Sequence, residues 1–297
     1  MMVRVSDFET VGPEHRDIFR EHYKKYPVEH SDYLHGIMCT WKHYMTYSFT
    51  ELEGSILILA EHDGEHYLRP PVGPLDREIF QEAANLSLEQ GWHPVFSMVG
   101  ERTAKFLEEE FPDMELHWHR DYFDYIYLAE DLRDLPGKRY LKIRNYLNRF
   151  RKNLDHSVEP ITRDNKDEVR EFLVRWCEKK GCREDPFLLY ERQANMYGID
   201  NFFELGFGGI CIRVNGRVEA LSIFEEMRPD MAVIHYEKAT FEIPGLYQAI
   251  NNEAAKLLSE SYRYIDREAD MGVPGLRRAK KKYRPDHMLK VSHMEMA

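Results

Sequence analysis

The sequence lacks the short motifs that identify several common enzyme classes. It contains no GxSxG, HExxH, GxGxxG or Walker phosphate-loop motif, so nucleophile-elbow hydrolases, zinc proteases, Rossmann enzymes and P-loop nucleotidases have no support. It has no apolar run of the roughly eighteen residues that a membrane-spanning helix requires. Its N-terminus, MMVRVSDFET, has no apolar signal core. We therefore expect a cytoplasmic protein without a membrane span.

Cysteine is scarce, and the histidines do not cluster. The 297 residues include four cysteines with no CxxC pair: Cys39, Cys177, Cys182 and Cys211. This spacing does not match a disulfide framework, so we expect four reduced thiols. Among the fourteen histidines, His117 and His119 share one face of a predicted strand, but the sequence supplies no third ligand. We predict no metal site.

Negative charge dominates the composition, but two segments are basic. The formal net charge of −11 argues against a general nucleic-acid binder and against attraction to an anionic membrane. Segment 135–154, LPGKRYLKIRNYLNRFRKNL, nevertheless carries seven Lys or Arg residues and no acidic residue, and its apolar residues recur at helical spacing. A solvated helix explains such a segment alone. Two of them in an acidic chain favour an anionic partner such as tRNA, bound through residues 138–152 and 277–284.

The predicted elements are of the α/β class, and their order occurs twice. Each half runs from helices through an antiparallel hairpin to a strand, a helix and a further strand, with hairpin turns at Asp63-Gly64 and Asn215-Gly216. A further hairpin is expected between 116–119 and 122–128. We place an N-terminal domain at 1–134, a basic linker helix at 135–154 and a C-terminal domain at 155–297.

The last third of the chain has the arrangement expected of a binding site. Residues 231–239 predict a strand, and Ile243-Pro244-Gly245 ends it. The helix predicted at 246–259 begins with free backbone N–H groups that could bind an anion or an acyl carbonyl. A strand at 262–266 follows, and then an acidic turn and a basic helix at 276–283.

Acyl transfer needs a base for the acceptor proton, a donor for the oxyanion and an acid for the leaving group. Glu237, near a strand end, is our candidate for the base or for binding an acceptor amine. Glu268 and Asp270 would point the same way in an extended turn and could hold a cationic acceptor. The structural alternatives are a surface ion pair for Glu237 and a loop that leads into the basic helix for the acidic pair.

The element order resembles the GNAT acyltransferase fold, in which a splayed pair of parallel strands binds an acyl donor beside a helix N-terminus. Two copies in one chain, with LPGKRYLKIRNYLNRF (135–150) and DREADMGVPGLRRAKKKYRP (266–285), resemble the DUF2156 family. That family is similar to the catalytic region of phosphatidylglycerol lysyltransferases and belongs with the tandem-GNAT transferases, which include the Fem-type aminoacyltransferases. The resemblance implies a transferase fold. It does not imply the lysyltransferase reaction, because we find no counterpart of the transmembrane half of those enzymes.

The resemblance also assigns expected roles to residues. Tyr283 would be the acid, although packing is the alternative for a tyrosine near a helix end, and Gly245, Leu246 and Tyr247 would border the donor carbonyl or phosphate. A cationic stripe at helical spacing would bind phosphates, chiefly through Arg277 and Lys281, with Lys280 and Arg284 beside them.

One stretch departs from the family pattern. Acetyl-CoA-binding GNAT enzymes carry a Gln/Arg-x-x-Gly-x-Gly/Ala loop before the donor helix, whereas this chain has TFEIPGL at 240–246, where Glu242 would repel a pyrophosphate.

These observations favour transfer of an acyl or aminoacyl group to an amine or hydroxyl acceptor. The donor is left open between aminoacyl-tRNA, which suits the basic segments, and acyl-CoA, which suits the fold in general. A hypothesis from a different class is a ligand-binding module on a GNAT scaffold that has lost catalysis.

Overall fold

The structure, a computed structural model, describes residues 3–182 and 184–296 and divides into two compact units. The first unit consists of Met1–Asp124, Ala269–Val273 and Met288–Ala297, and the second of Tyr125–Glu268 and Pro274–His287. By packing, the basic segment 135–154 belongs to the second unit. The domain limits drawn from composition, 1–134, 135–154 and 155–297, stay a prediction.

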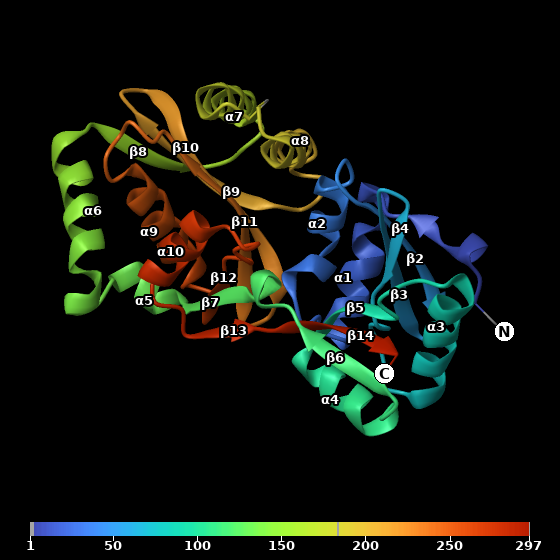
Figure 1. The fold of residues 1–297 in the computed structure, drawn as a ribbon. Coiled ribbons are helices and arrows are strands. Elements are labelled where there is room, and N and C mark those ends of the chain that lie inside the picture. Colours follow the sequence, from blue (N-terminus) through green and yellow to red (C-terminus); the bar gives the residue numbers. More distant parts are fainter. Residues whose placement is uncertain (1–2, 183, 297) are drawn as a thin grey trace. The chain divides into compact units, whose positions relative to one another are not determined.

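The first unit contains an antiparallel four-stranded sheet with the order β1-β2-β3-β4 and a three-stranded sheet with the order β5-β14-β6 (Figure 1). Its elements are η1 (Val5–Asp7), β1 (Glu9–Thr10), η2 (Pro13–His15), α1 (Arg16–Lys25), η3 (Ser31–Tyr33), α2 (His35–Thr40), β2 (Thr46–Leu52), β3 (Ser55–His62), β4 (Glu65–Leu68), α3 (Arg77–Gln90), β5 (Phe96–Gly100), α4 (Glu101–Glu110), β6 (Met114–Trp118), η4 (Arg120–Tyr122) and β14 (Val291–Met296).

Local sequence signals determine several of these elements. The hairpin turn at Asp63-Gly64 joins β3 to β4 as predicted, with Glu61 paired to His66. Helix α3 begins at Asp76, whose carboxylate accepts hydrogen bonds from two backbone N–H groups, and it ends at Gly91 in the left-handed conformation. The apolar faces of α3 and α4 pack with β3, β4, β5 and β14 in one core.

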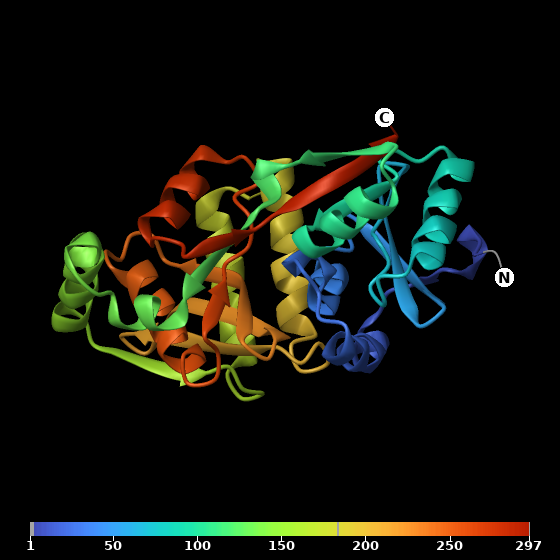
Figure 2. The ribbon, with the colours of Figure 1, turned by 90° about the horizontal axis from the view of Figure 1, so that it is seen from below.

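The hairpin expected between 116–119 and 122–128 is wrong. Strand β6 pairs with β14 near the end of the chain, with Trp118 opposite Ser292, and Figure 2 shows these two strands side by side. Strand β7 (Asp124–Leu128) pairs instead with β12 (Tyr264–Asp266) of the second unit. Each of the two strands pairs with a strand more than a hundred residues away in sequence, and no local turn signal predicts such a pairing.

The second unit is built on a seven-stranded sheet with the order β13-β7-β12-β11-β10-β9-β8. In Figure 1, α7 and α8 lie on one side of this sheet and α9 with α6 on the other. Its further elements are α5 (Ala129–Asp134), η5 (Lys138–Tyr140), α6 (Leu141–Asn153), β8 (His156–Pro160), α7 (Lys166–Lys180), α8 (Pro186–Asp200), β9 (Gly208–Val214), β10 (Arg217–Arg228), β11 (Met231–Ala239), α9 (Leu246–Leu258) and α10 (Pro274–Lys282). β13 (His287–Leu289) spans the point at which the chain returns to the first unit.

The middle of this sheet carries the feature that builds the site. The predicted β9–β10 hairpin at Asn215-Gly216 is present. Strands β11 and β12 are parallel, and the pairing of one with the other runs from Met231↔Tyr264 to Val233↔Asp266. Beyond that point β11 continues to Ala239 beside β10. The two parallel strands therefore part after Asp266, as the splayed pair of the GNAT fold does.

Two cysteines form a disulfide, which corrects the expectation of four thiols. Cys177 lies in the last turn of α7 and Cys182 just beyond it, with Cα atoms 5.3 Å apart. Gly181 adopts the left-handed conformation that ends the helix, and the reversed chain brings the N–H of Cys182 to the carbonyl of Cys177. The helix end, rather than a CxxC spacing, creates this pair. Cys39 and Cys211 are buried free thiols.

Candidate functional site

A buried ion pair occupies the place where β11 and β12 part. Arg267, the first residue after β12, donates from Nη2 to Glu237 Oε1 on β11 at 2.8 Å. The other carboxylate oxygen accepts a hydrogen bond of 3.0 Å from the side-chain amide of Asn251 on α9. The arginine and glutamate side chains are only 15% and 10% exposed, so both charges are largely withdrawn from water. Sequence elements far apart thus supply one polar cluster.

Two tyrosines enclose the guanidinium of Arg267. Its Cζ atom lies 4.9 Å from the ring centre of Tyr283 and 5.7 Å from that of Tyr127. Burial alone would lower the pKa of Arg267. The negative charge of the Glu237 carboxylate acts in the opposite direction, and the pKa of Arg267 lies above its ordinary value. Burial also raises the pKa of Tyr283 above its ordinary value, against the opposing effect of the Arg267 charge. The arginine is therefore cationic and the phenol protonated near neutral pH.

Unused hydrogen-bonding atoms point to a binding function for this cluster. Nη1 of Arg267 and Oδ1 of Asn251 are buried and have no hydrogen-bond partner among residues 3–182 and 184–296. Buried polar groups are normally paired, and leaving one unpaired is costly. A cationic donor and an amide oxygen left unpaired beside a protonated phenol suit a ligand that carries a polarised carbonyl.

A second buried cluster adjoins the first along β11. His235 donates from Nε2 to Glu225 at 2.7 Å and from Nδ1 to Glu268 at 2.8 Å. Its side chain is fully buried. Burial lowers the pKa of His235, but the hydrogen bonds and negative charges of the two glutamates outweigh this and raise the pKa to about 9. The histidine is therefore an imidazolium shared between two carboxylates.

The acidic turn does not have the predicted form. Glu268 has a φ of 57°, so the turn is not extended there, and Glu268 and Asp270 do not form the parallel pair that we expected. Glu268 bonds to His235 in the second unit, whereas Asp270 lies in the first unit and accepts from Arg120 at 3.3 Å. The structure brings Glu237 and Tyr283 together around Arg267 and leaves Asp270 outside that cluster.

The basic helix α10 presents a different surface from the predicted stripe. Lys280 is 7% exposed, and its ammonium group donates to the carbonyl oxygens of Arg267 and Glu268, so it fixes the turn instead of facing solvent. Arg277 is half-buried and Lys281 is exposed. The helical periodicity predicted that all the cations of the stripe share one face, but Lys280 bonds to the turn after β12 instead.

At the start of α9, one side of Gly245 packs against α6 of the same unit. Gly245 has a φ of 91°, and a Cβ added there would lie 2.4 Å from the carbonyl oxygen of Tyr146 on α6. Leu246 is fully buried. Tyr247 accepts a hydrogen bond of 3.3 Å from Trp176, and burial raises its pKa. Helix α6 therefore packs across the Gly245 side of this loop.

The two basic segments meet at the beginning of α6. Tyr140 donates to the carbonyl of Tyr283 at 2.8 Å, which joins the N-terminal end of one segment to the C-terminal end of the other. Arg139 and Arg151 are paired with acidic side chains, and Arg144 bonds to backbone carbonyls. The remaining exposed cations have no ion pair within the described chain: Lys138, Lys142, Arg149 and Lys152 on the first segment, and Arg278, Lys281, Lys282 and Arg284 on the second.

Comparison with known proteins identifies the family. The profile described as "Phosphatidylglycerol lysyltransferase, C-terminal" matches residues 20–292. The chain belongs to this family. A conserved protein of unknown function from Bacteroides thetaiotaomicron VPI-5482 is similar at 28% identity and a TM-score of 0.91, over 98% of this chain and 99% of that one. A search of curated proteins gave no match.

Two further solved structures establish the fold of this family member. L-PGS from Bacillus licheniformis has a TM-score of 0.67 at 15% identity, over 97% of this chain and 92% of that one. FemX has a TM-score of 0.57 at 10% identity, over 97% of this chain and 95% of that one. The fold is tandem GNAT-like, as predicted. No helix in the described parts of the chain has the length and apolar character needed to cross a bilayer. Within the same residues, no group of three His, Cys, Asp or Glu side chains could hold a metal ion.

The sequence analysis did not identify Arg267, Asn251 and His235 as site residues. A signal for His235 was present, because it and Glu237 are polar residues two apart on an otherwise apolar strand and so share a face. Arg267 and Asn251 gave no such signal. An arginine beside acidic residues suggests a surface loop, and an asparagine within a helix suggests solvent exposure.

Substitution of Gly245 by alanine is predicted to destabilise the second unit by about 2–4 kcal/mol, because the new Cβ meets α6 and the positive φ disfavours it. Urea unfolding measures the loss. Gly275→Ala in α10 is the matched control, since nothing lies within 4 Å of its added Cβ. Equal stability of the two variants would contradict the close approach of α6.

The stability of the protein should fall with rising pH through His235. Its pKa is near 6.5 when unfolded and about 9 when folded, so its stabilising contribution is complete below pH 6.5 and is lost as pH rises through 9. We expect the unfolding free energy of the wild type, relative to His235→Asn, to decrease by about 3 kcal/mol over that range. A difference that does not change with pH would show that His235 is not charged in the folded protein.

Proposed function

We propose that this protein is an aminoacyltransferase that moves an aminoacyl group from aminoacyl-tRNA to an amine or hydroxyl acceptor. The reaction would occur at the cluster around Arg267 in the second unit. Family membership and the fold shared with L-PGS and FemX support transferase chemistry in general. The choice of donor rests on one observation, the packing of the basic helix α6 across the Gly245 loop.

This packing favours tRNA over acyl-CoA as the donor. In acetyl-CoA-binding GNAT enzymes the glycine-rich loop before the donor helix lies beside the pyrophosphate, and close approach to it requires an open backbone. Here the Tyr146 carbonyl would lie within 2.4 Å of a Cβ at Gly245, and Glu242 adds a negative charge, paired with Lys179 at 3.0 Å. The same helix α6 turns cationic side chains to solvent, where the phosphates of a larger polyanion could reach them.

The chemistry requires no cofactor beyond the two substrates. An acceptor nitrogen or oxygen forms a bond to the carbonyl carbon of the aminoacyl ester, and the bond from that carbon to the ribose oxygen of tRNA breaks. The acceptor loses one proton and the ribose oxygen gains one, so charge and atoms balance. Between these events the carbonyl oxygen carries negative charge that a fixed donor can stabilise.

Individual residues have distinct roles in this proposal. Arg267, with Nη1 unpaired within the described chain, stabilises the carbonyl oxygen, and the protonated Tyr283 supplies the proton to the ribose oxygen. Glu237 has hydrogen bonds on both carboxylate oxygens, so it orients Arg267 in preference to acting as the base. Glu268, 27% exposed and bound to His235, receives the acceptor. A role for Asp270 stays a prediction.

Binding of tRNA should depend on the exposed lysines of the basic segments. We expect Lys281→Gln combined with Lys282→Gln to weaken tRNA binding and to reduce the slope of log K against log salt by about two, because each lysine would neutralise one phosphate. Lys24→Gln with Lys105→Gln removes the same charge from the first unit and should change neither quantity. Tight binding of CoA together with no salt-dependent binding of tRNA would overturn the choice of donor.

Substitution of Arg267 tests the catalytic cluster directly. Arg267→Gln is expected to lower kcat/KM about 10²–10³-fold while donor affinity changes little, because the guanidinium acts mainly when the carbonyl oxygen becomes charged. Arg170→Gln, which removes an exposed arginine paired with Asp200, should retain activity. If Arg267→Gln turns over at the wild-type rate, the cluster is not the active site. Binding of tRNA by a wild type that transfers nothing would favour a binding module.

A further inference from the structure

One side of helix α6 carries an exposed aromatic ring between two cations. Lys142, Tyr146 and Arg149 follow one another at intervals of four and three residues, so they form a strip along the helix, which we call the α6 strip. All three residues are exposed, and Tyr146 retains 41% of its accessible surface. The side chain of Tyr146 forms no hydrogen bond or ring contact with the rest of residues 3–182 and 184–296. The strip therefore offers both positive charge and an open ring face.

Two acidic side chains that approach this part of the chain are paired with other arginines. Asp131 accepts a hydrogen bond from Arg139, which precedes α6. Glu253 accepts one of 2.5 Å from Arg151, which lies on the other flank of the helix. Segment 135–154 contributes no acidic residue, and Asp155 follows only after the helix has ended. The α6 strip thus has no carboxylate from its own helix to neutralise it.

Helix α6 passes both parts of the candidate site of the second unit. It packs on α9, as Figure 1 shows, and the carbonyl of Tyr146 itself lies against Gly245, just before α9 begins. At the start of the helix, Tyr140 donates to the carbonyl of Tyr283, whose ring lies 4.9 Å from Arg267. A ligand bound on the α6 strip therefore lies on a helix that also contacts the Gly245 loop and Tyr283.

The combination of cations with an open aromatic ring fits an unpaired nucleic-acid strand. Lysine and arginine bind the phosphates of a duplex or of a single strand, but an aromatic ring gains energy from bases only where their faces are free to stack on it. A duplex keeps those faces inside its own stack. An anionic membrane would also attract the cations, but the apolar side of α6 is buried in the second unit, so it cannot enter a bilayer as an interfacial helix does.

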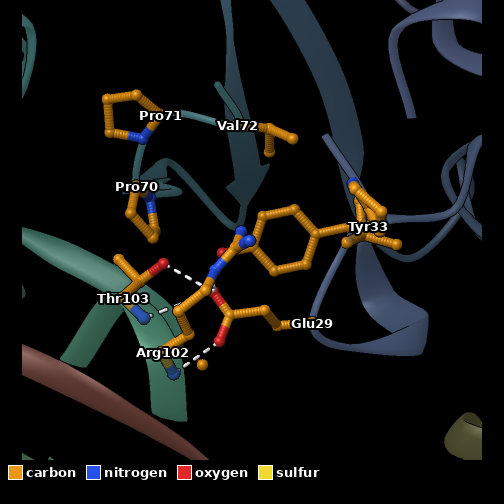
Figure 3. A pocket seen from close by; sticks show the side chains of 10 residues that line it. Glu29, Tyr33, Pro70, Pro71, Val72, Arg102 and Thr103 are labelled. Carbon is orange, nitrogen blue, oxygen red and sulfur yellow. Dashed lines mark hydrogen bonds and ion pairs between the residues drawn. The ribbon is translucent and has the colours of Figure 1, made fainter. Parts of the chain in front are cut away.

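The N-terminus of α4 in the first unit is not available to a phosphate. Helix N-termini commonly bind anions, but here the Glu29 carboxylate accepts hydrogen bonds from the backbone N–H of Arg102 at 2.7 Å and from the Thr103 hydroxyl at 2.6 Å (Figure 3). A phosphate would have to displace this carboxylate, whereas the α6 strip has no such competitor on its own helix.

We propose that the α6 strip binds the unpaired 3′ end of the tRNA donor, with one base stacked on Tyr146 and phosphates bound to Lys142 and Arg149. The inference rests on the proposed function, because tRNA carries the aminoacyl ester at its unpaired 3′ end. Tyr146 is then a specificity residue, which distinguishes an unpaired strand from a duplex, and the two cations supply affinity for either. No covalent bond changes in this step.

Binding of short RNAs to the whole protein tests the proposal without any transfer reaction. Fluorescence anisotropy compares a labelled single-stranded RNA that ends in CCA with a blunt hairpin of the same length, at several salt concentrations. The wild type should bind the single strand about tenfold more tightly. Tyr146→Leu should lose about tenfold in affinity for the single strand with an unchanged salt slope, because stacking releases no counterion, and Tyr146→Phe should retain it.

Two further variants separate charge from stacking. Lys142→Gln combined with Arg149→Gln should reduce the slope of log K against log salt by about 1.4, since each cation would neutralise one phosphate of a single strand. Tyr122→Leu, at a tyrosine of the first unit with the same 41% exposure, should bind as the wild type does. Arg267→Gln should also bind the RNA normally, because it removes a group of the reaction and not of the strip.

The outcomes distinguish this proposal from the choice of donor. Wild-type affinity in Tyr146→Leu, or equal affinity of the wild type for the single strand and the hairpin, would overturn the role of the α6 strip and leave the tRNA donor untouched. A wild type that binds neither RNA would overturn both. Binding to phosphatidylglycerol vesicles that falls in Tyr146→Leu, without binding of RNA, would overturn the proposal in favour of a membrane surface.

Discussion

The ion pair between Arg267 and Glu237 is the interaction on which the candidate site depends. It forms where β11 and β12 stop pairing, and the gap between these strands exists because β11 continues along β10 while the chain after Asp266 turns away. Lys280 fixes that turn through two backbone carbonyls, and Asn251 fixes the far side of the carboxylate. The position of one guanidinium nitrogen thus results from a strand register, a helix and a basic residue that the sequence alone would assign to the surface.

The two units use buried charge differently. In the second unit the buried cations Arg267, Lys238 and Lys280 have partners, and the unpaired buried atoms beside the gap include one nitrogen of Arg267 and one oxygen of Asn251. In the first unit the carboxylate of Glu29 accepts hydrogen bonds at the N-terminus of α4. A preorganised cluster with unpaired polar atoms suits catalysis on a ligand that arrives briefly.

Most of the fold could be predicted from local sequence signals, whereas the pairing of strands that are distant in sequence could not. Asp76, Gly91 and the turn at Asn215-Gly216 act within a few residues, so sequence reasoning found their helix and hairpin. The partners of β6 and β7 lie far along the chain, so the expected hairpin was wrong. Within the site, Glu237 and Tyr283 were predicted because each lies near the end of a strand or helix, where this fold places its functional side chains. Arg267 was missed, because only the gap between the strands makes it buried.

The most direct test of the central claim compares the two donor classes in one assay. Purified protein is incubated with a cell extract that supplies acceptors, and with either a mixture of tRNAs charged with labelled amino acids or a mixture of labelled acyl-CoA species. We predict that label leaves aminoacyl-tRNA and appears in an amide- or ester-linked product only when the active protein is present, and that acyl-CoA label is not transferred. Transfer from acyl-CoA with aminoacyl-tRNA left intact would contradict the account.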